Sequence, residues 1–283
     1  MAPTRSVPEP SAAFGYLDQA GPLALAHRGG ATDEDGLALE NSRQAFQAAV
    51  ALGYRYLETD VHVTRDGVLV SFHDETLDRT TNHTGQIGEL PYAQVRAALI
   101  AGREPIPTLA ELLAAWPDVR WNIDIKSESA IAPLVTLLRE ADALDRVCVA
   151  SFSTARLRRA RRLLGAQAAT AMGPAGVAVL AFVPSRRLRR WLLPAGVPCV
   201  QVPPYLPLRG PLRMLRRRTP RLVTARFVRR VHEHGAVVQV WTVNDVATMH
   251  RLLDLGVDGI ISDRIDILRD VLVARGQWNA ARA

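Results

Sequence analysis

Short apolar runs, typical of buried strands, alternate with longer helical patterns along most of this 283-residue chain. Eight such runs remain when VLVSFH (68–73) and its surroundings are treated as an insertion: LALAH, YRYLETDVHV, VRWNIDIK, VCVASF, AQAATAM, VPCVQV, VVQVWTV and DGIISD. Helices are expected over 42–52, 108–116, 130–143, 154–164, 175–193, 224–234, 245–255 and 265–275. Strand–helix repetition favours a parallel sheet, and eight units within about 250 residues favour its closure. The sequence therefore predicts an α/β fold, a (β/α)8 TIM barrel with a small insertion after the second strand.

The alternation is continuous, so we expect a single barrel domain over 23–276. Residues 1–22 and 277–283 are expected to be tails, and the proline- and arginine-rich piece from 203 to 221 a long loop. No stretch approaches the ~20 apolar residues that span a bilayer. The first residues also lack the apolar segment of a signal peptide. We therefore expect a cytoplasmic protein.

Cys148 and Cys199 are the only cysteines, and they are far apart in the sequence. Neither belongs to a CxxC motif or lies near a pair of histidines. A zinc site or a disulfide framework is therefore not expected. We predict two buried thiols in a reducing compartment.

The net charge of +7 conceals an uneven distribution. From Arg156 to Arg230 there are 18 arginines and no aspartate or glutamate, whereas the rest of the chain has 17 basic and 28 acidic residues, a balance of −11. One flank of the protein is therefore expected to be electropositive. Of the 35 basic residues only Lys126 is a lysine, a hint that an ammonium group is needed at that position.

Polar side chains follow the predicted strands, at the ends where such a barrel places its chemistry. His27 and Arg28 end the first run. Strand alternation places Glu58 and Asp60 on one face, about 7 Å apart along the backbone, and Asp124 ends another strand. Like charges this close repel unless a cation joins them. Three carboxylates without a thiolate or histidine cluster suit Ca²⁺ or Mg²⁺ better than zinc. Salt bridges to nearby arginines are the alternative.

His73 is a second histidine that ends a strand-like run, in VSFHD. Two imidazoles with pKa values near neutrality can divide proton removal and proton donation between them. The role of His62 stays open. We expect purely structural roles for the others, namely His83, His232, His234 and His250.

Several motifs follow one another in a characteristic order: HRG (27–29), ENS (40–42), LETDVHVTRDGVLVSFHD (57–74), LDRTT (77–81), NIDIK (122–126), VWTVND (240–245) and DGIISD (258–263). In this order they resemble the successive signatures of the glycerophosphodiester phosphodiesterase family. HRG alone is weakly specific. HRG followed by ExD, and then by DG before a strand that ends in HD, is highly specific. The resemblance extends from residue 23 to the end of the barrel.

The resemblance implies a metal-dependent TIM-barrel hydrolase that cleaves a glycerophosphodiester to sn-glycerol 3-phosphate and an alcohol. By this resemblance His27 and His73 would be the acid and the base, and we assign His27 as the base. The metal, Ca²⁺ or Mg²⁺, would be held by Glu58, Asp60 and Asp124. The nucleophile would be either the glycerol 2-hydroxyl, through a cyclic phosphate, or water.

Further matching positions imply roles in binding the substrate. Arg28 would bind a nonbridging phosphate oxygen, and Lys126 would lie close to the phosphate. Trp241 would form a wall of the pocket. Glu40 and Asn41 would support the order of the barrel mouth.

The chain departs from the family pattern at two places. The loop GATDEDGLAL between HRG and ENS is longer than usual and includes Asp33, Glu34 and Asp35, which could change how substrate enters. Asp124 stands where many members have glutamate, so its carboxylate reaches about one methylene less far. Metal affinity or identity could differ for this reason.

The segment VAVLAFVPSRRLRRWLLPAG (177–196) sets apolar runs and Trp191 beside four arginines. Surface helices of this composition lie on anionic bilayers. We therefore hypothesise peripheral contact with the anionic inner membrane leaflet, which would favour lipid-derived substrates such as lysophospholipids. The alternative is a solvated basic face over an ordinary barrel helix.

Other functions are compatible with parts of the sequence. A nucleic-acid-binding protein could use the basic flank, but few aromatic residues lie among the arginines and no recognition motif is present, so no nucleic acid partner is expected. A non-catalytic phosphodiester sensor would have lost an acid, a base or a ligand, and none is missing. Lysophospholipase D or phosphoinositide-type activity uses much the same residues and stays open. No obligate protein partner is evident.

Overall fold

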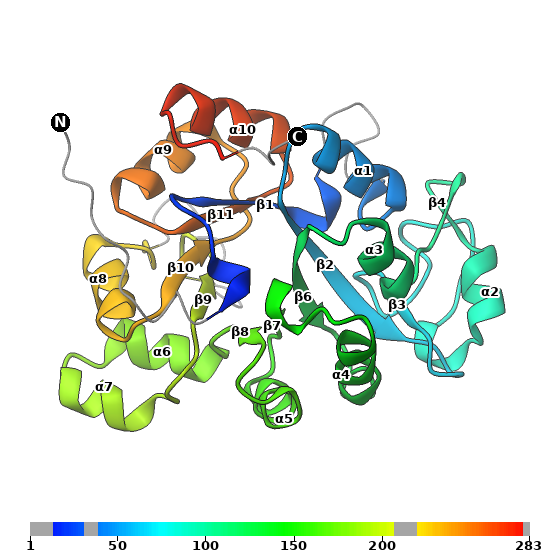
Figure 1. Cartoon of the computed structure of the whole chain (residues 1–283), viewed down its shortest axis with the longest axis horizontal. Coiled ribbons are helices and arrows are strands. Elements are labelled where there is room, and N and C mark those ends of the chain that lie inside the picture. The colour runs from blue at the N-terminus through cyan, green and yellow to red at the C-terminus, as the bar shows by residue number, and fades with distance from the viewer. Residues whose placement is uncertain (1–13, 31–38, 207–219, 280–283) are drawn as a thin grey trace.

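The computed structural model describes residues 14–30, 39–206 and 220–279, and in these residues eight parallel strands form a nearly closed barrel (Figure 1). The strands are β1 (Leu23–Ala26), β2 (Tyr56–Val63), β6 (Arg120–Ile125), β7 (Val147–Ala150), β8 (Ala169–Thr170), β9 (Cys199–Val202), β10 (Val237–Val240) and β11 (Gly259–Ser262). Their hydrogen-bonded order is β8-β7-β6-β2-β1-β11-β10-β9. A parallel bridge between Ala171 and Cys199 joins the two ends of this order. The predicted TIM barrel is confirmed.

Helices follow the strands and surround the barrel (Figure 1). They are α1 (Arg43–Ala51), α3 (Leu109–Ala115), α4 (Ile131–Glu140), α5 (Thr154–Leu164), α6 (Pro174–Phe182), α7 (Arg186–Leu192), α8 (Ala225–Glu233), α9 (Val246–Asp254) and α10 (Ile265–Ala274). Local sequence fixes where many of them begin, because a hydroxyl or carboxylate accepts a hydrogen bond from a backbone N–H of the first turn. Thr108 does so at α3 and forms a reciprocal capping box with Glu111.

The single helix expected over 175–193 is instead two helices, α6 and α7. Pro184 explains the break: it has no N–H to continue the helix and it disfavours helical geometry at the residue before it. Val183 is accordingly extended, with ψ 115°. Ser185 then starts α7 by accepting a hydrogen bond from Leu188 N–H.

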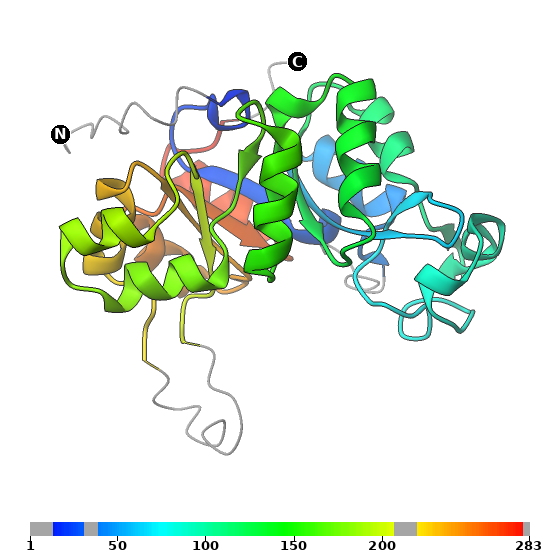
Figure 2. The same ribbon diagram turned by 90° about the horizontal axis from the view of Figure 1, so that it is seen from below.

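The predicted insertion follows β2 and lies at one end of the molecule, whereas α6 and α7 lie at the opposite end (Figures 1 and 2). It consists of β3 (Leu69–Ser71), antiparallel to β2, then α2 (Tyr92–Ala97) and the short pair β4 (Leu99–Ile100) and β5 (Glu104–Pro105). It has an apolar cluster of its own, formed by Val70, Phe72, Leu77, Ile87, Val95, Ala98, Ile100 and Ile106.

The described parts of both expected tails pack on the barrel. Tyr16 is fully buried, its ring lies edge-on to Tyr56 with 5.3 Å between centroids, and Tyr56 Oη donates a hydrogen bond to its carbonyl. Trp278 packs against Tyr54 with 5.1 Å between centroids. Residues 14–17 and Trp278 are therefore held on the barrel by contacts distant in sequence. Residues 1–13 and 280–283, and 207–219 of the expected long loop, lie outside the described residues.

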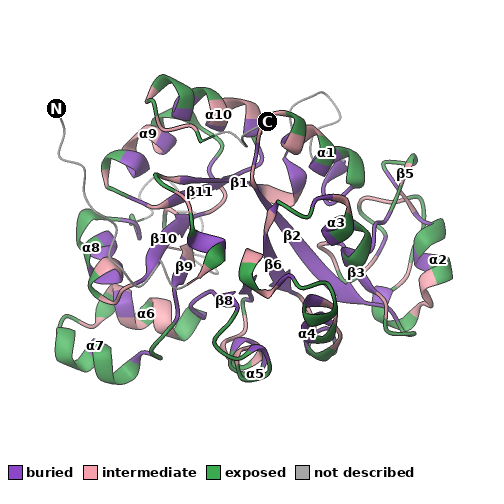
Figure 3. Ribbon diagram, viewed as in Figure 1, coloured by how far each residue is buried: buried purple, intermediate pink, exposed green. Residues whose placement is uncertain are grey.

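The barrel interior changes from apolar to charged along the strands, which are buried over most of their length (Figure 3). Tyr16 fills its amino-terminal end, together with buried Cys148 and Cys199, which form no disulfide. In the middle Gln201 donates hydrogen bonds of 2.8 Å to Asn122 and Gln239. Charged side chains then gather at the carboxyl ends of the strands. Among the helices of the described residues, none is both long and apolar enough to cross a membrane.

Candidate active site

A tight turn after β1 places His27 and Arg28 at the barrel mouth. Arg28 has a left-handed backbone with φ 52°, and Gly29 follows with φ 88°. A Cβ at Gly29 would lie 2.7 Å from the Ala45 side chain in α1, so only glycine fits this close approach. The turn directs Arg28 back across the mouth, toward β2.

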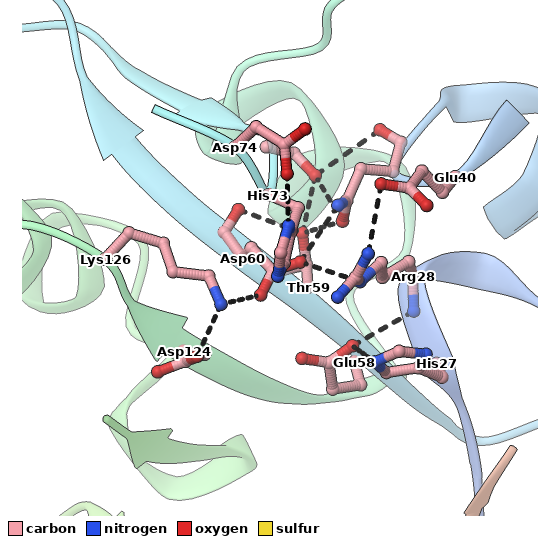
Figure 4. A network of polar contacts seen from close by, with 12 residues as sticks. His27, Arg28, Glu40, Glu58, Thr59, Asp60, His73, Asp74, Asp124 and Lys126 are labelled. Atoms are coloured by element: carbon pink, nitrogen blue, oxygen red, sulfur yellow. Dashed lines mark hydrogen bonds and ion pairs between the residues drawn. The ribbon is translucent and has the colours of Figure 1, made fainter. Parts of the chain in front are cut away.

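Asp60 is the centre of a buried network of charges (Figure 4). It pairs in register with Asp124 on the neighbouring strand, and Lys126 Nζ lies 2.7 Å from a carboxylate oxygen of each. The other Asp60 oxygen lies 3.2 Å from Arg28 Nε and accepts a 3.1 Å hydrogen bond from Asn41 Nδ2. Burial alone would raise the pKa of Asp60, but Lys126 and Arg28 outweigh it and lower that pKa. Burial raises the pKa of Asp124.

Glu58 and His27 lie beside this network. Glu58 Oε2 accepts a 3.0 Å hydrogen bond from the Arg28 backbone N–H and lies 3.9 Å from His27 Nε2. Burial, together with Asp60, raises the pKa of Glu58 to about 7. On its other side His27 Nδ1 lies 2.6 Å from Asp263 Oδ1. Burial opposes protonation of His27, but Glu58 and Asp263 outweigh it and raise the pKa of His27.

His73 is held by a second aspartate, Asp74, at 2.5 Å from Nδ1 (Figure 4). Arg79 lies 2.5 Å from both Asp74 and Glu40, and Glu40 in turn accepts a 3.1 Å hydrogen bond from Arg28. The hydrogen bond from Arg79 lowers the pKa of Asp74 to about 2, and His73 adds to the effect. The insertion is thus fastened to the barrel mouth through Arg79 and Glu40.

His62, whose role the sequence left open, lies two residues beyond Asp60 on β2, where this strand pairs with β3. It is buried, and its Nε2 is 3.2 Å from the His73 carbonyl oxygen. Burial lowers the pKa of His62, which favours the neutral imidazole. His62 therefore supports the backbone of His73.

Aromatic side chains form one side of the mouth. Trp241 follows β10, and its ring meets that of Phe152 edge-on with 5.3 Å between centroids. Phe152 follows β7 and is 64% exposed, which is unusual for a phenylalanine. Lys126 Nζ lies 5.7 Å from the centre of the Phe152 ring, so the aromatic pair borders the charged network directly.

The structure brings all the predicted site residues to this end of the barrel, connected by the contacts above. Five further residues lie here that the sequence did not single out: Asp74, Arg79, Phe152, Asn244 and Asp263. Asp263 could have been predicted from the sequence, because the strand alternation through Gly259 and Ile261 continues to it. In the structure Asn244 Nδ2 donates a 2.7 Å hydrogen bond to Asp263. Asp33, Glu34 and Asp35 of the long loop lie outside the described residues.

The carboxylates of the mouth are the candidate ligands for a divalent cation. As placed, no three histidine, cysteine or carboxylate side chains of the described residues converge into a ligand group, and Lys126 bridges Asp60 and Asp124. Asp124 Oδ1, however, is buried without a hydrogen-bond partner among the described residues. Burial and Asp60 raise the pKa of Glu58 more than His27, Arg28 and Lys126 lower it, so its negative charge is only partly offset. Because Glu58, Asp60 and Asp124 all offer carboxylate oxygens, these three residues fit a hard cation such as Ca²⁺ or Mg²⁺.

Comparisons with known proteins agree with the motifs. The model of the "Glycerophosphoryl diester phosphodiesterase family" matches residues 27–267. A "Probable glycerophosphodiester phosphodiesterase 2" of Mycobacterium tuberculosis is 43% identical over 94% of this chain and 96% of its own length. A crystal structure of a putative family member from Silicibacter pomeroyi superposes with a TM-score of 0.71 at 23% identity, covering 93% and 98% of the two chains. The chain therefore belongs to the glycerophosphoryl diester phosphodiesterase family of phosphoric diester hydrolases, as its motifs predicted.

Proposed function

We propose that the protein hydrolyses glycerophosphodiesters to sn-glycerol 3-phosphate and an alcohol, with two histidines as acid and base. One observation supports this most directly: each histidine at the mouth is oriented by its own aspartate, His27 by Asp263 and His73 by Asp74. A solved structure from Oleispira antarctica, described as a phosphodiesterase in complex with the product sn-glycerol-3-phosphate, has a TM-score of 0.69 to this chain at 22% identity. That product is the one we propose here.

The charges of the mouth favour a divalent cation as cofactor, Ca²⁺ or Mg²⁺. Three carboxylates of the mouth, Glu58, Asp60 and Asp124, have only two cationic side chains beside them, Arg28 and Lys126. Without a metal ion, a phosphodiester anion would therefore meet a site that has no net positive charge. Glu58, Asp60 and Asp124 would hold the cation. When bound, the cation would neutralise phosphate charge in the transition state and orient the ester.

The protein groups then have distinct tasks. Arg28 and Lys126 bind nonbridging phosphate oxygens and stabilise the charge that develops on them. With Asp263 accepting the hydrogen bond from Nδ1–H, the free Nε2 of His27 can remove the proton from the attacking hydroxyl, either the glycerol 2-hydroxyl or water. His73, oriented by Asp74, gives its proton to the leaving alkoxide, so one proton enters and one leaves the histidine pair.

Metal dependence has a direct test. Incubation with EDTA is expected to abolish release of glycerol 3-phosphate from a panel of glycerophosphodiesters, and Ca²⁺ or Mg²⁺ added back is expected to restore it. Circular dichroism run in parallel separates loss of activity from loss of fold. Full activity after exhaustive chelation would contradict the cofactor and leave the acid–base proposal standing.

Lysophospholipids are a second substrate class, as the sequence left open. A human "Lysophospholipase D GDPD1" is 27% identical over 88% of this chain and 85% of its own length. The exposed pair Phe152 and Trp241 gives the mouth an apolar side, which an acyl chain could contact. Lysophosphatidylcholine in the same panel tests this class: preference for it over glycerophosphocholine would support lipid substrates, and no turnover would exclude them.

Asp263 is expected to act by positioning His27. Replacing Asp263 with asparagine keeps the size of the side chain but removes the charge that orients the imidazole. We expect kcat to fall by about 10- to 100-fold, less than on loss of the imidazole itself, with KM nearly unchanged. Steady-state kinetics measures this, with Asp66→Asn on the exposed turn after β2 as the matched control. A rise in KM at constant kcat would instead indicate a role in binding.

A further inference from the structure

Helix α6 is composed almost entirely of apolar residues, yet it is poorly covered. Its sequence is PAGVAVLAF, and Leu180 is its only buried residue. A helix that is apolar on all sides is normally enclosed by protein or lipid. Here Pro174, Ala175 and Ala178 are exposed, and Phe182 at its end is 66% exposed.

Helix α7 continues this surface and separates apolar from basic side chains. Residues three and four apart share a helix face, so Leu188, Trp191 and Leu192 form one stripe. Arg186, Arg187 and Arg190 form the adjoining stripe by the same spacing. Every one of the six is exposed, Trp191 by 80%, and Figure 3 shows α7 in the exposed colour over most of its length.

Helix α7 packs against the rest of the protein through other residues. Leu193 is buried, and Arg189 is buried with an ion pair of 2.8 Å from its Nη2 to Glu233. The same arginine donates hydrogen bonds to the carbonyls of Val183 and Pro184 at the break between the helices. This anchoring fixes the orientation of α7, so both of its stripes face outward.

The surroundings of the two stripes are strongly positive. The sequence has no aspartate or glutamate between Asp145 and Glu233, and Glu233 already pairs with Arg189. On α8, which packs against α6, Arg226 and Arg229 are also exposed. In the described residues, the surface of α6 and α7 therefore combines exposed apolar side chains with uncompensated positive charge.

We propose that this surface, formed by Phe182, Leu188, Trp191 and Leu192 with Arg186, Arg187 and Arg190, docks the protein on an anionic lipid bilayer. The apolar stripe enters the boundary between headgroups and acyl chains, while the arginines contact lipid phosphates beside it. Docking here goes beyond the proposed hydrolysis, which needs none of these residues. Of the two helices, α6 begins four residues after the end of β8, at the edge of the barrel mouth.

Charge and shape favour a bilayer over the other occupants. In a symmetric contact between two copies, each basic stripe would lie close to its equivalent, and the like charges would repel. A nucleic acid would satisfy the arginines but leave Leu188, Trp191 and Leu192 in water. An anionic bilayer satisfies both stripes together.

Sedimentation with vesicles tests the proposal on the full chain. The protein is expected to co-sediment with vesicles of phosphatidylglycerol and phosphatidylcholine in equal amounts at physiological salt, and not with pure phosphatidylcholine. The variant R186Q/R187Q/R190Q is expected to lose on the order of 100-fold in partitioning, since each basic residue near such a surface contributes about fivefold. The variant L188S/W191S is expected to lose binding too, because insertion of the apolar stripe is removed.

A matched control replaces three exposed arginines away from α7, as R43Q/R65Q/R96Q on α1 and in the insertion at the opposite end of the molecule. This control changes the net charge equally and is expected to bind like wild type.

A second measurement reports insertion directly. Brominated acyl chains are expected to quench the fluorescence of Trp191, and this quenching is expected to be absent in W191L.

Other results would overturn the proposal. These are equal loss in the control triple variant, binding that L188S/W191S does not weaken, tight binding to a nucleic acid with none to vesicles, or self-association abolished by L188S/W191S without membrane binding. Soluble glycerophosphodiester turnover, measured without vesicles, is expected to stay unchanged in every variant. Failure of docking is thereby distinguished from failure of the proposed activity.

Discussion

Replacing His73 with alanine is expected to lower kcat by ~10²- to 10⁴-fold, because general acid–base catalysis contributes that much when a positioned imidazole is present. The same loss is expected for His27→Ala. Release of glycerol 3-phosphate under saturating substrate measures it. His83→Ala is the matched control, since His83 is exposed and belongs to the same insertion as His73.

The leaving group distinguishes the two roles. A p-nitrophenyl phosphodiester needs little protonation of its leaving oxygen, so the activity of the variant lacking the acid is expected to recover on it, whereas the variant lacking the base stays slow. Recovery in His73→Ala alone supports His73 as acid and His27 as base. Recovery in His27→Ala alone would reverse the assignment, and near-normal turnover of both variants on the natural ester would refute the histidine pair.

Asp60→Asn is expected to lower the free energy of unfolding by about 3–5 kcal/mol, the usual consequence of removing one partner from a buried charge pair. Lys126 and Arg28, both largely buried, would lose the carboxylate that lies 2.7 and 3.2 Å from their nitrogens. Urea unfolding followed by circular dichroism gives the shift in midpoint. Glu128→Gln is the control, because its 2.7 Å pair with Arg159 is about half exposed and is expected to contribute less than about 1 kcal/mol.

A second variant keeps the Asp60 result interpretable. Asp60→Asn combined with Lys126→Met removes both charges and is expected to be more stable than Asp60→Asn alone. If the single variant unfolds at the same urea concentration as wild type, the Asp60 network does not contribute to folding as described.

The sequence made the barrel and most of the mouth predictable because both depend on local periodicity. Alternation placed Glu58 and Asp60 on one face of β2, and adjacent parallel strands then paired Asp60 with Asp124 in register. The strand-ending positions of His27 and His73 followed from the same reasoning. Parallel strands align their carboxyl ends, so these separate predictions converge on one site.

Other features depend on contacts that local pattern does not encode. Tyr16 lies in the short segment FGYL, which has no strand or helix periodicity, and its burial at the base of the barrel arises only when Tyr56 and the cysteines are brought around it. Phe152 is the last residue of the strand-like run VCVASF, whereas in the structure it follows the strand and is exposed at the mouth. The break at Pro184 was readable, but the apolar runs on both sides of it favoured one long helix.

The insertion has a mechanical consequence for catalysis. His73 belongs to a segment with a separate small core, whereas His27 is attached to the main barrel. The distance between the two imidazoles therefore depends on the pairing of that segment with β2 and on the ion pair between Arg79 and Glu40. Loosening of this junction would change the distance between the proposed proton donor and acceptor while the rest of the molecule kept its shape, so turnover is expected to respond to substitutions at Arg79 and Glu40.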